Sequence, residues 1–223
     1  MYERLQCVNS DHVPLVVHHI TNTIISVLKP INLQEVWIVI EGIALAVVSV
    51  VVNAFWIMIP AYIPNSAAAL IKGTFPMDFG KSLADGKRVI GDGKTFRGFF
   101  GGVICGILAG CIQIWAYNQY HLEFLPQHTL LSITLLSVGS MVGDVVASFL
   151  KRRRGMNRGE EWAFVDQYDF LIGAFILLII FDWSWVHENI PVAVLIAIII
   201  MTPLLHRAVN MIGYKLGFKD VPW

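Results

Sequence analysis

The sequence predicts an all-helical integral membrane protein with five transmembrane helices, its N-terminus outside the cell and its C-terminus in the cytoplasm. Composition is the first reason: hydrophobic residues make up 56% of the 223 residues and charged residues only 14%, against about 25% in an average soluble domain. The mean hydropathy of +0.65 agrees. The second reason is that several stretches reach the roughly 20 mostly apolar residues that a membrane-spanning helix needs.

The expected spans cover, in order, residues of about 36–62, 98–118, 129–150, 169–186 and 190–212. Only a few residues around 187–189 separate the last two spans, which predicts a helical hairpin. Residues 1–34 are expected to form an extracytoplasmic segment with a surface helix in LVVHHITNTIISVLKP. Residues 35–223 are expected to form one membrane domain, with polar loops over about 63–97 and 151–168.

The basic residues give the expected orientation. Fourteen of the sixteen lysines and arginines fall in the two long loops and at the C-terminal end, and the other two are Arg4 and Lys29. Five crossings place these three basic regions on one side of the membrane, and Lys and Arg in short loops mark the cytoplasmic side. We therefore expect a multi-pass protein of the cell membrane with both long loops in the cytoplasm.

Glycines recur every four residues in the second expected span, at Gly98, Gly102, Gly106 and Gly110. Such a stripe lets another helix backbone approach closely, so helix packing is favoured over a direct role in lipid binding. The cysteines have no spacing typical of a metal site and are interpreted as small buried hydrophobic residues.

An aspartate interrupts the third expected span close to its basic end. Asp144, Ser148 and Lys151 are spaced to lie on one face of a helix. Because an ionised aspartate costs about 2.5–3.5 kcal/mol at the centre of a membrane, it is expected to face the bundle interior and to have a partner. A structural pair with a nearby arginine is the alternative.

Two more acids, Asp166 and Asp169, stand three residues apart where the fourth expected span begins. The helix dipole favours a carboxylate at this position, which explains one of the two acids. It does not explain two acids on one face together with Asp144 on the preceding span. Three carboxylates without Cys or His ligands suit a hard cation such as Mg²⁺. A magnesium site beside lysines and arginines is typical of proteins that bind nucleotide polyphosphates.

Several motifs resemble one enzyme family. Residues 148–152 (SFLKR) are similar to the opening of the CDP-diglyceride synthetase signature, and residues 166–169 (DQYD) to its close. The chain has Asn157-Arg158 where the bacterial and eukaryotic pattern has Lys-Asp, and it lacks that pattern's His-Gly-Gly element. With PAYIPN, PMDFGKSLADGKRVIGDGKT, GDGKTFRG and the terminal GFKDVPW, residues 35–223 resemble the archaeal branch, the CDP-archaeol synthases.

The resemblance implies a Mg²⁺-dependent membrane nucleotidyltransferase. Its expected partners are CTP, an isoprenoid ether-lipid phosphate and the bilayer, with no nucleic acid. The implied reaction joins CTP to 2,3-bis-O-(geranylgeranyl)-sn-glycerol 1-phosphate and releases pyrophosphate. The metal-binding and catalytic acids carry over to Asp144, Asp166 and Asp169. The family's basic pair, which is assigned to phosphate binding, carries over to Lys151 and Arg152, and Lys151 is also a candidate catalytic residue.

The remaining candidates come mainly from the long loop. Lys94 and Arg97 are hypothesised to bind the nucleotide. Asp92, Thr95 and Asn65 are further candidates, for which turn or capping roles are equally plausible, and Ser148 joins them through the signature. His206 and Asn210, four residues apart on the last span, could either bond across helices or hold substrate.

Two other functions compete with a cytidylyltransferase. A CTP-dependent polyprenol kinase or a CDP-alcohol phosphotransferase would use similar groups, but the latter needs its acids in one short run, and here the Asp-Gly pair and Asp144 are far apart. A lipid or ion transporter would show repeated, interrupted helices around a midplane site. No internal repeat is found, and the acids gather at one end of the spans.

Overall fold

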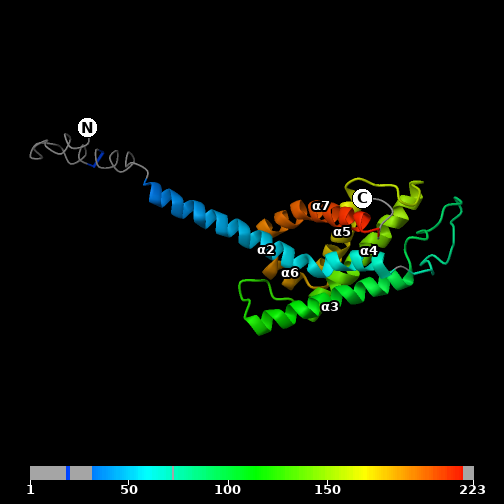
Figure 1. Ribbon diagram of the computed structural model, residues 1–223, viewed down its shortest axis with the longest axis horizontal. Coiled ribbons are helices and arrows are strands. Elements are labelled where there is room, and N and C mark those ends of the chain that lie inside the picture. Colours follow the sequence, from blue (N-terminus) through cyan, green and yellow to red (C-terminus); the bar gives the residue numbers. More distant parts are fainter. Residues whose placement is uncertain (1–18, 21–31, 72, 218–223) are drawn as a thin grey trace, which may run out of the picture. The chain divides into compact units, whose positions relative to one another are not determined.

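The computed structural model describes residues 19–20, 32–71 and 73–217, and within these ranges every regular element is helical (Figure 1). The chain divides into two compact units, Met1–Ala46 and Val47–Trp223. The surface helix predicted within 15–30 lies outside the described residues, apart from His19 and Ile20. The helices are α2 (Leu33–Ile71), α3 (Phe96–Tyr120), α4 (Leu130–Arg153), α5 (Val165–Phe181), α6 (Trp183–Asn189) and α7 (Val192–Lys215).

Four of these helices are long and apolar enough to cross a membrane, and α5 with α6 makes a fifth crossing if that bent pair is one span. The predicted class, an all-helical multi-pass membrane protein, is confirmed. The fourth span differs from the prediction: α5 ends at Phe181, and α6 leaves it at 112°. The break falls at Asp182, whose φ of -147° and ψ of 50° lie outside the helical region.

Two of the spans, α3 and α4, begin where the sequence provides a side-chain cap. Thr95 caps α3 by accepting a hydrogen bond from the Gly98 amide. Thr129 and Ser132 form a reciprocal capping box at the start of α4. The last turn of α4 carries three cations, which the negative end of the helix dipole favours.

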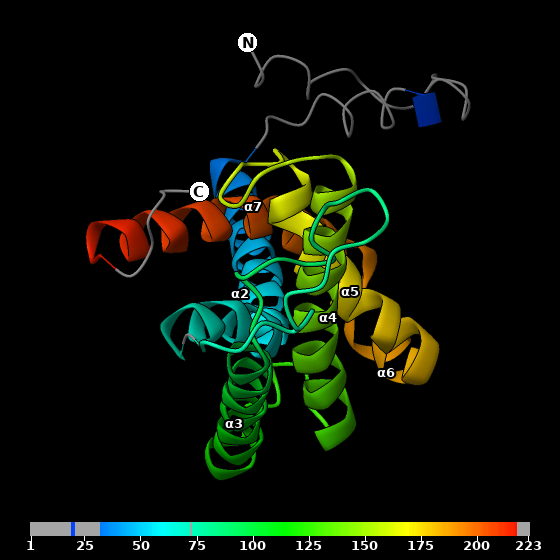
Figure 2. The ribbon, with the colours of Figure 1, turned by 90° about the vertical axis from the view of Figure 1, so that its right-hand side faces the viewer.

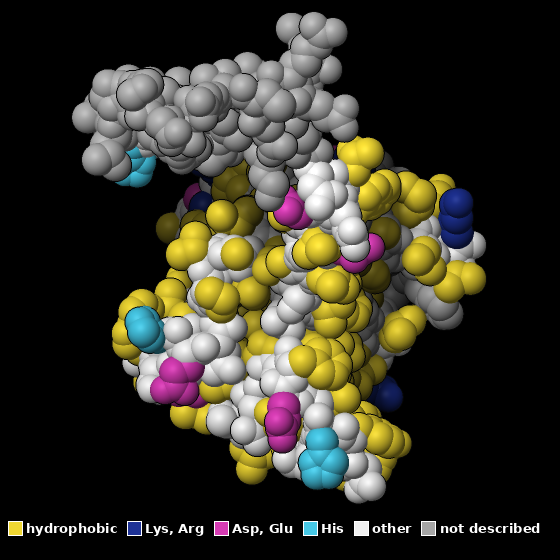
Figure 3. Space-filling model, turned by 90° about the vertical axis from the view of Figure 1, so that its left-hand side faces the viewer, with side chains coloured by type: hydrophobic (Ala, Val, Ile, Leu, Met, Phe, Trp, Pro, Cys, Tyr) yellow, Lys and Arg dark blue, Asp and Glu magenta, His cyan; other side chains and the backbone are white. Residues whose placement is uncertain are grey.

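The helices pack around a core of small and branched side chains, and their outer faces stay apolar. Core residues from α2, α4, α5 and α7 include Ile57, Leu136, Ala174 and Ile198, all fully buried. Many large hydrophobic residues on the same helices are exposed, as expected for surfaces that face lipid. On the face turned to the viewer in Figure 3, hydrophobic side chains predominate, with acidic and histidine side chains scattered among them.

Two prolines interrupt the backbone hydrogen bonds of α2, and other helices satisfy the carbonyls that they free. Pro60 has no N–H, so the carbonyl oxygen of Trp56 loses its helical partner. The amide of Gln113 on α3 donates to that oxygen at 2.8 Å. Pro64 frees the carbonyl of Pro60 in the same way, and the hydroxyl of Ser137 on α4 donates to it at 3.0 Å.

The proline in α7 follows the same rule. Pro203 frees the carbonyl of Ile199, and the hydroxyl of Tyr168 on α5 donates to it at 3.0 Å. Tyr62 on α2 bonds to the hydroxyl of Thr202, the residue before this proline, at 3.0 Å. Because a lone carbonyl in hydrocarbon costs several kcal/mol, these bonds fasten α7 to α2 and α5.

Glycines set the closest helix contacts. The predicted stripe on α3 is confirmed as a packing surface: a Cβ on Gly102 or Gly106 would lie 2.6 Å from the carbonyl of Pro64 or from its ring. A tighter contact joins α4 and α5, where a Cβ on Gly143 would strike the carbonyl oxygen of Asp169. The two backbones therefore touch at the level of the acidic residues.

Candidate functional site

Asp78 is the centre of the loop that joins α2 to α3. Its buried carboxylate accepts two bonds from the Arg88 guanidinium, at 2.6 and 3.2 Å. It also accepts from the backbone amides of Gly80, Ile90 and Gly91, at 3.1, 3.0 and 2.8 Å. Burial alone would raise the pKa of this carboxyl, but the guanidinium and the three amides outweigh it and hold the pKa of Asp78 well below its usual range. The loop is thus folded around an ionised group.

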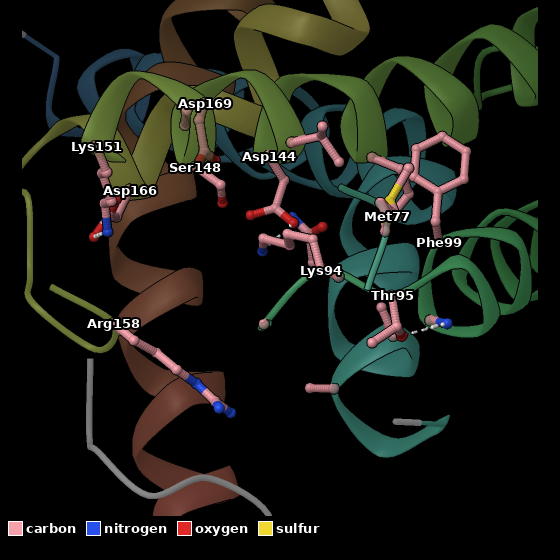
Figure 4. Close-up of a pocket in the computed structure, with 18 of the residues that line it drawn as sticks. Met77, Lys94, Thr95, Phe99, Asp144, Ser148, Lys151, Arg158, Asp166 and Asp169 are labelled. Carbon is pink, nitrogen blue, oxygen red and sulfur yellow. Dashed lines mark hydrogen bonds and ion pairs between the residues drawn. The ribbon is translucent and has the colours of Figure 1, made fainter. Parts of the chain in front are cut away.

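The same network places the turn that carries Lys94. The Met77 amide donates to the Lys94 carbonyl at 2.8 Å, and the Lys94 amide donates to the Gly91 carbonyl at 3.4 Å. Arg88 also pairs with Asp92 at 2.7 Å. With its backbone held in this way, Lys94 extends its side chain toward α4 (Figure 4).

The cations at the end of α4 fasten the loops on either side. Arg153 pairs with Asp85 at 2.6 Å and donates to two carbonyls of the α2–α3 loop. Arg152 donates to the carbonyls of Met156 and Asn157, at 2.6 and 3.3 Å. The guanidinium of Arg152, which the resemblance assigns to phosphate binding, is therefore engaged by the protein's own backbone.

The other two cations of this cluster hold the loop between α4 and α5. Lys151 pairs with Asp166 at 2.5 Å and donates to the Glu160 carbonyl at 3.1 Å. The Arg154 guanidinium lies over the Trp162 ring, 4.3 Å from its centroid, in a cation–π contact. The four cations thus hold both polar loops to the end of α4, and Figure 2 shows the two loops at that end of the helix.

A cavity of about 690 Å³ lies at this polar end, between the loops and the ends of the helices. Binding pockets for small molecules span roughly 300–1,000 Å³, so the volume suits a nucleotide-sized ligand. Its charged lining is Asp92, Lys94, Asp144, Lys151, Arg158, Asp166 and Asp169.

Each of two aspartates in the cavity is paired with a lysine. Lys94 lies 2.5 Å from Asp144, and Lys151 lies 2.5 Å from Asp166 (Figure 4). One oxygen of Asp169 accepts the backbone amide of the next residue at 2.5 Å. The three acids therefore line one cavity, and lysine ammonium groups neutralise Asp144 and Asp166.

The chemistry of the three carboxylates suits a hard cation, although their present positions do not form a metal site. Within the described ranges, no three His, Cys, Asp or Glu side chains converge on one point in the manner of a metal site. Yet Lys94 stands as a cation among all three carboxylates: burial of its ammonium would lower its pKa, but the charges of Asp144, Asp169 and Asp166 raise it overall. Carboxylate oxygens are the ligands that Mg²⁺ prefers, so the position suits a divalent ion.

The structure gathers most of the predicted residues at this cavity. Asn65, Asp92, Lys94, Thr95, Asp144, Ser148, Lys151, Asp166 and Asp169 all line it, with His206 and Asn210 from α7. Arg97 and Arg152 do not line it, and Arg97 is exposed on the first turn of α3.

Two functional residues were missed by the sequence reasoning. Arg158 lines the cavity from the loop before α5, and its side chain extends into it in Figure 4. Arg158 stands where the related signature has an aspartate, and that departure was the one available signal. Nothing in the sequence indicated that Asp78 is buried, because a loop has no periodic hydrophobic pattern from which burial can be inferred.

A helical membrane bundle with four carboxylates and three cations in one terminal cavity is the arrangement expected of a membrane enzyme for a phosphorylated substrate. The model of the CarS-like CDP-archaeol synthase family matches residues 47–223. CDP-archaeol synthases from Methanoculleus marisnigri and Methanospirillum hungatei are 56% and 52% identical over 166 residues, covering 74% of this chain and 100% of each relative. The chain belongs to the CarS-like CDP-archaeol synthase family.

A solved structure agrees with this assignment. The structure described as "an intramembrane enzyme for archaeal membrane lipids biosynthesis" is 30% identical, with a TM-score of 0.58, and the match covers 72% of this chain and 94% of the other. This protein is therefore a membrane nucleotidyltransferase of archaeal lipid biosynthesis, as the sequence motifs predicted.

Proposed function

We propose that this protein transfers CMP from CTP to the phosphate of 2,3-bis-O-(geranylgeranyl)-sn-glycerol 1-phosphate, giving unsaturated CDP-archaeol and pyrophosphate. The observation that supports it most is the cavity in which Asp144, Asp166 and Asp169 meet Lys94, Lys151 and Arg158. This cavity lies at the end of apolar helices, where a polar nucleotide and a lipid headgroup can both reach it. CTP is a cytoplasmic substrate, so this end faces the cytoplasm, in agreement with the charge pattern.

The chemistry requires positioning and charge neutralisation. An oxygen of the lipid phosphate attacks the α-phosphorus of CTP in line, the bond to the β-phosphate oxygen breaks, and pyrophosphate leaves with that electron pair. Lys94, Lys151 and Arg158 line the cavity and supply positive charge for the triphosphate and the leaving group. The two lysines exchange their aspartate partners for phosphate oxygens as the substrate binds.

Asp144, Asp166 and Asp169 would hold Mg²⁺, which supplies further positive charge at the phosphate oxygens. The Ser148 hydroxyl faces the cavity near these acids (Figure 4). Asn65 contributes another polar group, because its side-chain oxygen is buried without a hydrogen-bond partner among the described residues. That oxygen is available to accept a hydrogen bond from a ligand.

The direct test uses the full-length protein in detergent, with CTP labelled at the α-phosphorus and the lipid phosphate as acceptor. Label should enter the lipid, and pyrophosphate should appear in equal amount. Label from the γ-phosphate on a lipid alcohol would instead indicate a kinase. Release of neither product by folded protein would contradict the proposal.

The acids are tested by Asp144→Asn and Asp169→Asn. Each should lower kcat by about 100-fold or more, the effect typical of losing one key electrostatic group. Glu161→Gln is the matched control, because Glu161 is an exposed acid in the same polar region and does not line the cavity. Full activity in either aspartate variant would contradict the assignment.

The metal is tested by its removal. Chelation with EDTA should abolish turnover, and added Mg²⁺ should restore it. Isothermal titration should also show that CTP binds more weakly without Mg²⁺, and that this difference disappears in Asp144→Asn. Unchanged turnover in EDTA would refute the metal requirement.

A further inference from the structure

Three phenylalanines form a cluster at the base of α3. The rings of Phe75 and Phe79 are 5.6 Å apart between centroids, and each contacts the ring of Phe96, at 6.4 and 5.3 Å. Phe75 is 61% exposed and Phe79 is 60% exposed. Neither lines the cavity, so neither is explained by the site. A contiguous exposed aromatic patch indicates an interaction surface.

The cluster continues the lipid-facing side of α3. Phe96 is the first residue of that helix, and Phe100, one turn later on the same side, is 58% exposed. Ile104 and Leu108 follow at the same four-residue spacing, both exposed at 56%. In a helix that is long and apolar enough to span a membrane, such a side faces hydrocarbon. The three rings therefore lie where this surface reaches the membrane boundary.

A cation accompanies the rings. Arg97 follows Phe96 on the first turn of α3, is exposed, and does not line the cavity. Aromatic rings together with a long basic side chain are typical of the interface between headgroups and acyl chains, where the ring is half-buried and the cation reaches lipid phosphates. This arrangement selects the bilayer as the occupant of the patch.

The backbone at Phe79 is held in an unfavourable conformation. Phe79 has φ of 54°, in the left-handed region that a bulky residue rarely adopts. Its amide donates to the Pro76 carbonyl at 3.1 Å, and on its other side the Gly80 amide donates to the Asp78 carboxylate at 3.1 Å. Such strain persists only where the surrounding structure imposes it, and here it turns Phe79 outward while Asp78 is buried.

The patch is tied directly to the site. The Phe96 amide donates to the Phe75 carbonyl at 3.3 Å, and the Met77 amide donates to the Lys94 carbonyl at 2.8 Å. We propose that Phe75, Phe79 and Phe96, with Arg97, insert into the bilayer interface and anchor the α2–α3 loop to the membrane surface. The anchor fixes the height of Lys94 relative to the lipid phosphates. That last consequence rests on the proposed function, whereas the insertion does not.

The test measures insertion directly. Cys7, Cys105 and Cys111 are replaced by serine or alanine, and Phe79→Cys is labelled with an environment-sensitive nitrobenzoxadiazole probe. Ala84→Cys is the matched control, because Ala84 is exposed on the same loop but outside the cluster. Both proteins are reconstituted in phosphatidylcholine–phosphatidylglycerol vesicles, with and without lipids that carry a doxyl quencher near the headgroup.

The probe at position 79 should show blue-shifted emission that the doxyl lipids quench, and the probe at position 84 should show neither effect. Equal quenching at both positions, or none at position 79, would overturn the proposal. Cross-links between two copies at position 79, without quenching, would show that a second chain covers the patch and would also overturn it.

A second variant covers the case in which the label disturbs the fold. In vesicles at high salt, the membrane should protect the α2–α3 loop from trypsin. The double variant Phe75→Ser with Phe79→Ser should lose part of this protection, so trypsin should cleave it faster at Lys81 and Lys87. In detergent, where no bilayer interface exists, the variant and the unaltered protein should be cleaved at more similar rates. An unchanged cleavage rate in vesicles would contradict the anchor, whatever the enzyme's activity.

Discussion

Asp78→Asn should open the α2–α3 loop while leaving the helical bundle folded. The carboxylate accepts five hydrogen bonds in all, two at Oδ1 and three at Oδ2. An asparagine has one acceptor oxygen. If that oxygen still accepts from the amides of Ile90 and Gly91, the NH₂ group of the asparagine faces the Gly80 amide and the Arg88 guanidinium. Both of these are donors, so neither can bond to it.

The cost follows from those two bonds. A hydrogen bond to a charged group is worth about 1.5–3 kcal/mol, and the buried carboxylate loses two of them. We therefore expect the closed loop to lose about 3 kcal/mol or more, which is about a hundredfold in the ratio of closed to open loop. Because the pKa of Asp78 lies below its usual range, this contribution is complete above that range and is lost only as the pH falls through the lowered pKa.

Hydrogen exchange followed by mass spectrometry measures this change. Peptides that cover 78–95 should exchange about a hundredfold faster in Asp78→Asn, whereas peptides from α4 and α5 should not change. Asp85→Asn is the comparison variant: Asp85 lies in the same loop, but its side chain is 42% exposed, so losing its pair with Arg153 should speed exchange far less. Unchanged exchange at residues 90 and 91 would refute the idea that this carboxylate organises the loop.

Three further substitutions test the bundle itself. Ser137→Ala leaves the buried carbonyl of Pro60 without a partner and should cost about 1–3 kcal/mol in unfolding from detergent, whereas Thr134→Val, which removes an exposed hydroxyl of α4, should cost little. Burial lowers the pKa of His128 to about 4, so the folded state excludes a proton that the unfolded chain takes up near pH 6.5. Stability should therefore fall from pH 6.5 toward 4 by up to about 3 kcal/mol, and thermal unfolding of His128→Gln should show a smaller loss. Gly143→Ala forces a methyl group against the Asp169 carbonyl and should abolish turnover through displaced acids, so near-normal kcat would contradict the close contact of α4 and α5.

The spans and the cavity acids could be predicted because each depends on a local pattern. Apolar length marks the helices, and the four-residue glycine spacing marks the packing face of α3, which the structure confirms. Asp144 was informative because an acid is costly in an apolar helix, so its presence requires a polar cavity or a partner.

The remaining features depend on tertiary contacts that no local sequence pattern indicates. The apolar run through Phe181 continues past Asp182, so hydropathy alone places one long span where the chain bends. Arg97 stands close to Lys94 in the sequence, but the helix that begins at Phe96 turns its side chain away from the cavity. Arg152 belongs to a basic motif, yet backbone carbonyls of the following loop take up its guanidinium.

The carbonyls released by the prolines make certain residues replaceable only as sets. Pro64 and Ser137 are 73 positions apart, yet both act on the carbonyl oxygen of Pro60. Replacing Ser137 alone leaves that oxygen without a donor, and replacing Pro64 alone introduces a backbone amide that competes for it. Tyr168 and Pro203 are joined in the same way. Engineering of this bundle should therefore replace such partners together, since replacing only one of them leaves the hydrogen bonding of the carbonyl unbalanced.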